Sequence, residues 1–291
     1  MMQSSADLRG LTWQELEITA PEAVSSELEI FLTDCRLGGW VVEAEVPSLR
    51  LAAYLPCSGE WEERLHNIES GVRSLGGEFR VRRSVVDEDW AECWKKFYHP
   101  KRFGKSIVVC PSWEKFDAQP SDKVITLDPG MAFGTGLHAS TAMCLEMMEE
   151  LFAAEHPDSV IDVGTGSGIL AIAARLLGAS KIEASDSDPV AVKSAAENFV
   201  INGLTDSKPF EYVGVPSDKG RFNLVCANLV ASLLCRLAPA LDKAAEPSGS
   251  MVLSGIVEER CQDVIDEFAA LGWNVHKRLE QNTWVCLWMK R

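Results

Sequence analysis

The strongest constraint on the fold is one short segment near the middle of the chain. Residues 160–168 form an apolar run that ends in a glycine-rich turn, VIDVGTGSG, and the next residues, ILAIAARLLG, have the composition of a buried helix. Such a strand–turn–helix unit opens many parallel sheets, because the glycines allow a tight turn and a close approach of a ligand to the backbone. The segment predicts a ligand-binding sheet edge, although glycine-rich turns also occur for packing alone.

The alternation of strand, turn and helix continues to the end of the chain. It predicts strands at 159–164, 181–186, 210–214, 222–229 and 250–255, and helices at 167–178, 189–203, 231–244 and 257–272. Two final apolar segments, 273–279 and 283–289, are predicted to close the sheet as an antiparallel hairpin. This alternation indicates a doubly wound, Rossmann-like α/β domain with helices on both faces of the sheet, which we expect to span residues 121–291.

The first part of the chain has a different pattern. Strands are predicted at 12–20, 38–46, 49–56 and 78–86, and helices at 21–35 and 61–76. The order β-α-β-β-α-β is that of a ferredoxin-like α+β domain, here over residues 1–87. Residues 88–120 are rich in aromatic and basic side chains, which predicts a packed segment between the domains rather than a flexible linker. A role of that segment in holding substrate is the alternative interpretation.

Charge and cysteine usage exclude several classes of function. The chain has 43 acidic and 28 basic residues, a formal net charge of -15, so it lacks the basic face that direct nucleic-acid binding needs and is better suited to a basic partner. Its nine cysteines are scattered, without a CxxC pair, which predicts reduced thiols and neither a metal site nor a disulfide framework. Without a signal peptide or an apolar run of about 20 residues, the expected location is the cytoplasm.

Polar residues at the predicted strand ends indicate a nucleoside cofactor. Asp186 ends the second strand, 22 residues after Gly164, where a carboxylate can accept hydrogen bonds from a ribose diol. The alternative is that Asp186 or Asp188 caps the next helix ahead of Pro189, and we assign the cap to Asp188. The turn has the spacing GxGxG, with Asp162 before its first glycine, which favours a cationic, phosphate-free cofactor such as S-adenosylmethionine over a dinucleotide.

Two further segments are candidates for the same edge. Asn228 ends the fourth predicted strand, where its side-chain oxygen and a nearby backbone carbonyl can accept hydrogen bonds from an amine; as an alternative, it caps the next helix. The segment LDPGMAFGTGLHAST places two glycine turns around Phe133 and a helix start near Ser140 or Thr141. This loop can form a wall of the site or be an ordinary loop with a helix cap. His138 is expected to be structural.

Several segments together resemble the ribosomal protein L11 methyltransferase family of class I methyltransferases. They are EDWAECWKKFYHP, GKSIVVCPSWE, LDPGMAFGTGLHASTAMCLEMM, VIDVGTGSGILAIAARLLGASKIEASDSDPVAV, NLVCANLVASLLCRLAP and LSGIVEE. The resemblance implies a ferredoxin-like substrate-recognition domain joined to a Rossmann-like methyltransferase domain. It also implies cofactor contacts from Thr141, Gly164, Asp186 and Asn228, with Phe133 and its loop enclosing the methionine end. Asp162 and the turn glycines Gly166 and Gly168 complete the expected cofactor site.

The functional hypothesis is transfer of a methyl group from S-adenosylmethionine to a lysine or α-amino nitrogen of a basic protein, with ribosomal protein L11 as the implied substrate. Asn228 and a carbonyl near Leu229 are predicted to orient the nitrogen. Lysine has a reference pKa of about 10.4, so desolvation and the positive cofactor must lower it. The alternatives are a methyltransferase of the same fold that acts on another protein lysine or a small molecule, and a nicotinamide-dependent oxidoreductase.

Overall fold

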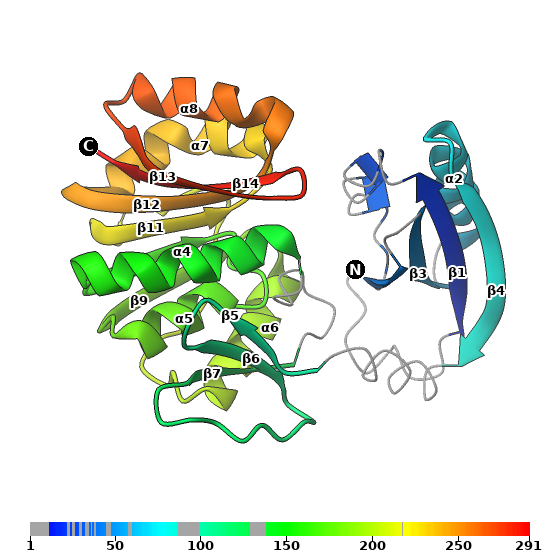
Figure 1. Ribbon diagram of the computed structural model, residues 1–291, viewed down its shortest axis with the longest axis horizontal. Coiled ribbons are helices and arrows are strands. Elements are labelled where there is room, and N and C mark those ends of the chain that lie inside the picture. The colour runs from blue at the N-terminus through cyan, green and yellow to red at the C-terminus, as the bar shows by residue number, and fades with distance from the viewer. Residues whose placement is uncertain are drawn as a thin grey trace. The chain divides into compact units, whose positions relative to one another are not determined.

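Figure 1 shows the computed structural model of the chain, which forms two compact units, Met1–Tyr98 and His99–Arg291. The structure describes residues 12–21, 24, 27–28, 31–32, 35, 37, 39–44, 48–57, 60–86, 99–128, 138–216 and 218–291. Among the helices in these ranges, none is both long and apolar enough to cross a membrane.

The first unit contains an antiparallel sheet of four strands with the order β2-β3-β1-β4. Its elements are β1 (Thr12–Pro21), β2 (Gly39–Ala44), β3 (Ser48–Pro56), α2 (Trp61–Ser74) and β4 (Glu78–Val86). β3 lies between β2 and β1, and β4 pairs with the other edge of β1, which is the strand order of a ferredoxin-like domain. The predicted fold class is therefore confirmed for this unit.

The core of this unit follows from the period of two along β1. Leu16 and Ile18 are fully buried and belong to one apolar cluster with Ile68 and Val72 of α2. Alternate residues of a strand point to opposite faces, so these side chains define the face that the helices cover. Of the predicted helix 21–35, residues 27–28 and 31–32 are helical and Pro21 instead ends β1; most of the remainder lies outside the described residues.

The second unit is built on a sheet of seven strands with the order β10-β9-β8-β11-β12-β14-β13. Its strands are β8 (Ser159–Val163), β9 (Lys181–Asp186), β10 (Phe210–Glu211), β11 (Phe222–Asn228), β12 (Ala245–Val257), β13 (Asn274–Gln281) and β14 (Trp284–Lys290). The first five are parallel, and the predicted antiparallel hairpin is confirmed. Its second strand, β14, lies between β12 and β13.

Helices cover both faces of this sheet (Figure 1). They are α4 (Ala139–Glu155), α5 (Ile169–Leu177), α6 (Pro189–Ile201), α7 (Ala231–Ala244), and α8 (Cys261–Ala269) after a short 3₁₀ turn (Glu258–Arg260). Val160 and Cys226 belong to the apolar cluster with α4, α5 and α6, whereas Ile161 and Val225 belong to the cluster with α7 and α8. Two consecutive residues on each of these strands are thus apolar, because a parallel sheet is buried on both faces. The Rossmann-like fold class is confirmed.

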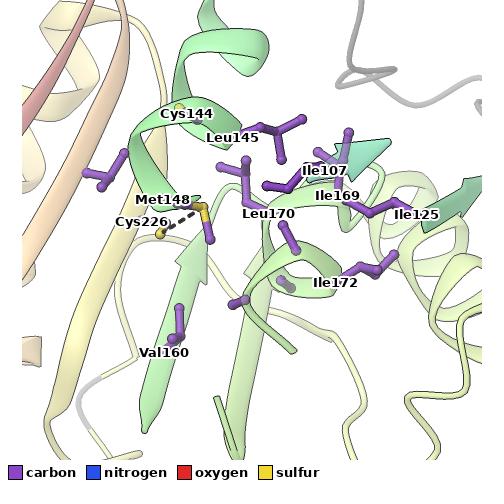
Figure 2. Packing of buried hydrophobic residues seen from close by; sticks show 14 of the residues in the cluster. Ile107, Ile125, Cys144, Leu145, Met148, Val160, Ile169, Leu170, Ile172 and Cys226 are labelled. Atoms are coloured by element: carbon purple, nitrogen blue, oxygen red, sulfur yellow. Dashed lines mark hydrogen bonds between the residues drawn. The ribbon is translucent and has the colours of Figure 1, made fainter. Parts of the chain in front are cut away.

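A second, three-stranded sheet was missed by the sequence patterns. It consists of β5 (Lys101–Phe103), β6 (Ile107–Pro111) and β7 (Lys123–Leu127), in the order β5-β6-β7. Figure 2 shows Ile107 and Ile125 of this sheet beside Ile169 and Leu170 of α5, and all four belong to the same buried cluster. Residues 99–120, which the sequence analysis assigned to a segment between domains, therefore fold with the second unit. Residues 88–98 of that segment lie outside the described residues.

Candidate cofactor and acceptor site

The predicted site residues that the structure describes converge on the carboxyl edge of the seven-stranded sheet. β8 and β11 are neighbours in register, with Asp162 opposite Cys226, and β11 pairs with β12 so that Asn228 lies opposite Ser254. β9 pairs with the other side of β8 and brings Asp186 to the same edge. Residues far apart in the sequence thus meet because parallel strands end at one edge, which is where open α/β sheets bind ligands.

The glycine-rich turn after β8 needs its three glycines for backbone geometry. Gly164, Gly166 and Gly168 have φ values of 75°, 55° and 84°, in the left-handed region that glycine enters without steric cost. The amides of Gly164 and Thr165 donate to the carbonyl oxygen of Ser185 at 2.8 and 3.0 Å, which ties the turn to β9.

Two of these glycines also allow close packing. A methyl group on Gly164 would lie 2.5 Å from Cδ2 of Leu229, and one on Gly168 would lie 2.8 Å from the ring of Phe199 in α6. Distances this short exclude any side chain without a local shift. The packing interpretation of the turn is therefore correct for these two positions, and it is compatible with close approach of a ligand to the backbone.

Asp186 links the two turns that follow β8 and β9. Its Oδ2 accepts the Gly166 amide at 2.9 Å, and its Oδ1 accepts the Asp188 amide at 3.0 Å. Asp188 is the N-cap of α6: its carboxylate accepts the Val190 amide at 2.8 Å, with Pro189 in the first helical turn. The predicted cap is confirmed, and the half-buried Asp186 keeps lone pairs for a further donor such as a ribose hydroxyl.

Asp162 lies beneath the glycine-rich turn, with only 1% of its surface exposed. Its Oδ2 accepts a hydrogen bond from the Thr165 hydroxyl at 2.7 Å, and its Oδ1 is buried without a hydrogen-bond partner among the described residues. Burial raises the pKa of this carboxyl to about 7, the bond from Thr165 opposes the rise, and the charge of Asp186 adds to it. The site therefore contains a carboxyl group whose ionised form a nearby cation would favour.

Asn228 ends β11 with its amide held in one orientation. Its Nδ2 donates to the hydroxyl of Thr141 in α4 at 3.2 Å, and its Oδ1 is buried without a hydrogen-bond partner in the described part of the chain. The alternative that Asn228 caps the next helix is wrong, because the N-cap of α7 is Val230, which makes no side-chain capping bond. Leu229 donates its amide to the carbonyl of Ser254 at 2.9 Å. The amide oxygen of Asn228 is thus an unused acceptor at the ligand edge.

The first turn of α4 supplies the neighbouring wall. His138 is its N-cap and accepts the Ser140 amide at 3.3 Å, while its ring meets Trp284 edge-on with 4.7 Å between centroids. The structural role expected for His138 fits these contacts. Helix α4 begins at Ala139, one residue before the predicted start, and places the buried Thr141 against Asn228. Phe133 and residues 129–137 around it lie outside the described residues.

Two asparagines, Asn198 in α6 and Asn202 at its C-cap, support the site and were not predicted from the sequence. Asn198 is fully buried, accepts the Asp128 amide at 3.0 Å and donates to the Ser167 carbonyl at 2.9 Å. Asn202 accepts the Thr126 amide and donates to the Thr126 carbonyl. Their spacing of four puts both on one helix face. Asparagines at that spacing within an apolar helix were the only sequence signal for this role.

Comparison with known proteins gives one consistent result. The model of a family described as ribosomal protein L11 methyltransferase matches residues 12–291. A relative of that name from Geotalea uraniireducens is 35% identical over 304 residues, 94% of this chain and 96% of its own length. Another from Pelotomaculum thermopropionicum is 38% identical over 306 residues, 95% of this chain and 98% of its own length.

A solved structure agrees with these relatives. The crystal structure of a ribosomal protein L11 methylase from Lactobacillus delbrueckii subsp. bulgaricus matches with a TM-score of 0.60 and 31% sequence identity. The match covers 67% of this chain and 98% of that chain. Both the sequence and the fold therefore have relatives of the same name over most of the chain.

Proposed function

Because the chain belongs to the ribosomal protein L11 methyltransferase family, we propose that it transfers methyl groups from S-adenosylmethionine to amino groups of ribosomal protein L11. The observation that carries this proposal is the buried Oδ1 of Asn228, an acceptor without a partner among the described residues at the ligand edge of the sheet. A buried polar atom of this kind is costly unless a ligand or water satisfies it. An amine that donates a hydrogen bond is such a ligand.

The cofactor half of the site consists of the glycine-rich turn, Asp186 and Asp162. The turn offers backbone without side chains at Gly164, Gly166 and Gly168, and the free lone pairs of Asp186 suit a ribose diol. The raised pKa of Asp162, about 7, suits a cationic ligand, since a positive charge nearby would stabilise its ionised form. S-adenosylmethionine combines a ribose with a positively charged sulfonium, and when bound it supplies the methyl group. The expected contact of Phe133 with its methionine end stays a prediction.

The acceptor half consists of Asn228 and Leu229, with Thr141 accepting the bond that holds the Asn228 amide. The contacts of Thr141 and Asn228 with the cofactor, which the family resemblance implies, stay a prediction. The Asn228 Oδ1 and the Leu229 carbonyl would accept hydrogen bonds from a neutral amine and so align its lone pair with the methyl carbon. The proton that the nitrogen must lose before attack goes to water, since Asn228 is not a base and the nearby carboxyls belong to the cofactor half. Catalysis then depends on proximity and alignment, with desolvation lowering the pKa of the amine.

The assignment of the remaining regions follows from the same proposal. The ferredoxin-like unit, over predicted residues 1–87, would recognise the basic substrate protein, and the methyltransferase domain, predicted over 121–291, would bind the cofactor. The net charge of -15 would steer a basic ribosomal protein toward the enzyme, with no direct contact to nucleic acid required. Such a substrate places the reaction in the cytoplasm.

The test is a methylation assay with purified L11, S-adenosylmethionine carrying a labelled methyl group and the full-length protein. Label in L11, located by mass spectrometry on lysine or α-amino nitrogens, is the expected result. Calorimetry should show binding of S-adenosylmethionine and none of NAD. Label in a small molecule or another protein of a cell extract, with none in L11, would contradict the substrate assignment, and binding of NAD alone would favour the oxidoreductase alternative.

A further inference from the structure

The segment LSGIVEE, which contributed to the family resemblance, has so far entered the site only through Ser254. It ends β12, and β12 pairs with β11 so that Ser254 lies opposite Asn228. Between Leu253 and Ile256 the register of β12 against β14 shifts, so the backbone at 254–255 departs from regular pairing. Gly255 lies at this irregularity with a φ of 77°, in the left-handed region.

Gly255 lies close to the two proposed acceptor oxygens of the site, the carbonyl oxygen of Leu229 and Oδ1 of Asn228. A methyl group on Gly255 would lie 2.7 Å from the carbonyl oxygen of Leu229 and 3.0 Å from Oδ1 of Asn228. Both distances are below ordinary van der Waals contact between carbon and oxygen. Any side chain at this position would therefore have to displace these two oxygens or cover them on one side.

Leu229 is consequently confined between two glycines. Its side chain rests on Gly164 of the cofactor turn, its amide is fixed by the Ser254 carbonyl, and its carbonyl oxygen faces Gly255. Asn228 is fixed from the other side by its bond to Thr141. The two oxygens therefore have few ways to move aside if a methyl group is added at 255.

We infer that Gly255 is a positioning residue for methyl transfer, whose missing side chain leaves the Asn228 Oδ1 and the Leu229 carbonyl in the positions from which they accept hydrogen bonds from the acceptor nitrogen. This inference rests on the proposed function and deepens it, because it assigns the role to acceptor geometry and not to cofactor binding. Misplacing a reacting group by about 1 Å costs on the order of 100-fold in rate. Substitution at Gly255 should thus lower kcat and leave the affinity for S-adenosylmethionine unchanged.

The test compares Gly255→Ala with Gly203→Ala. Gly203 has nearly the same φ, 75°, but an added methyl group there would meet nothing within 4 Å. Both variants therefore carry similar left-handed strain, and only the first approaches the acceptor oxygens. Gly255→Asn and Gly203→Asn provide a second pair, because asparagine tolerates the left-handed region better than alanine and keeps the protein folded at lower cost.

The expected result is a kcat about 100-fold lower for G255A than for G203A in the L11 assay, with dissociation constants for S-adenosylmethionine within about twofold of each other. In an Asn228→Ala background, G255A should cause a smaller further loss than in the wild type, since one of its two targets is gone and only the Leu229 carbonyl remains. Equal kcat values for both members of a pair would overturn the inference, and so would a loss in cofactor affinity that accounts for the change. If the wild-type protein transfers no methyl group to L11, both the proposed function and this inference are overturned. If the wild type is active and G255A is as active as G203A, only this inference is overturned.

Discussion

Asp162, one residue before the end of β8, and Asn228, the last residue of β11, lie on neighbouring strands of the same sheet, and each has one buried oxygen without a hydrogen-bond partner among the described residues. They differ in charge. Asp162 has a carboxyl with a pKa near 7, whereas Asn228 has a neutral amide fixed by Thr141. A carboxylate stabilises a cation, and an amide oxygen accepts a hydrogen bond from an amine without holding it as an ammonium ion. The pair therefore suits a methyl donor that is positively charged and an acceptor that must be neutral.

The largest effect is expected at Asn228. Asn228→Ala removes an acceptor aimed at the amine, and we expect kcat to fall by about 100-fold, the scale seen when one aligned hydrogen-bonding group is lost from an active site. The dissociation constant of S-adenosylmethionine should change far less. Initial rates with L11 and calorimetry with the cofactor measure the two quantities.

Asn223→Ala is the matched control for Asn228→Ala. Asn223 lies at the amino end of the same strand and accepts the amides of Asp158 and Ser159, far along the strand from the acceptor edge. Its loss should lower the melting temperature and leave kcat nearly unchanged. A normal kcat for Asn228→Ala would contradict the role of Asn228 as acceptor of the amine hydrogen bond, and with it the proposed difference in role between Asn228 and Asp162.

Asp186 should produce the largest effect on the cofactor side. Asp186→Ala removes the proposed ribose acceptor and the partner of the Gly166 and Asp188 amides. Hydrogen bonds to charged groups contribute about 1.5–3 kcal/mol, so we expect cofactor affinity to weaken by roughly 10- to 100-fold. Turnover at saturating cofactor should be affected less. An unchanged dissociation constant would mean that Asp186 only shapes the turn.

The pKa of Asp162 predicts a smaller, pH-dependent effect. If the cation selects the ionised carboxyl, the dissociation constant of S-adenosylmethionine should be about tenfold larger at pH 6 than at pH 8, with proton release on binding at pH 6. Calorimetry in buffers of different ionisation enthalpy counts these protons. In Asp162→Asn, the pH dependence of this dissociation constant should reflect only the titration of the cofactor itself. The same pH dependence in the wild type and in Asp162→Asn would contradict the pairing of the Asp162 carboxylate with the cofactor's positive charge.

The same pKa has a consequence for stability without cofactor. The folded-state value lies above the ordinary value of 3.8, so the unfolded chain ionises first as the pH rises. The free energy of unfolding should therefore decrease between about pH 4 and pH 7, by up to about 1.4 kcal/mol per pH unit from this group, and level off above it. Chemical denaturation of the wild type and Asp162→Asn at several pH values isolates this contribution.

The smallest effect is expected at the support of the cofactor turn. Asn198→Ala removes the hydrogen bonds that this side chain makes with the Asp128 amide and the Ser167 carbonyl, and should lower stability by about 1–3 kcal/mol. Because Ser167 belongs to the turn, S-adenosylmethionine should also bind several-fold more weakly. Asn202→Ala, which loses bonds to the backbone of Thr126 and Asn198 and none to the turn, should lower stability alone. Equal affinities in the two variants would show that Asn198 supports the fold and not the turn.

Much of the fold followed from local patterns because each element's pattern matches its environment. β8, buried on both faces, is apolar on consecutive residues, and β1 alternates, so their types were predictable. β5, β6 and β7 were missed because they are short and their apolar residues are buried by α4 and α5, two helices that come later in the chain.

The sequence by itself determined the glycine-rich turn, the acids at the ends of β8 and β9 and the asparagine at the end of β11, because the turn glycines and the ends of strands have local signals. Only the tertiary structure decided that Asn198 supports the turn, that Thr141 orients Asn228 and that Gly255 lies against its free oxygen. These contacts join residues from 27 to 87 positions apart, and their distances depend on the pairing of β11 with β12 and the packing of α4 and α6 on the sheet. No local pattern encodes such distances, since they are set by which strands become neighbours.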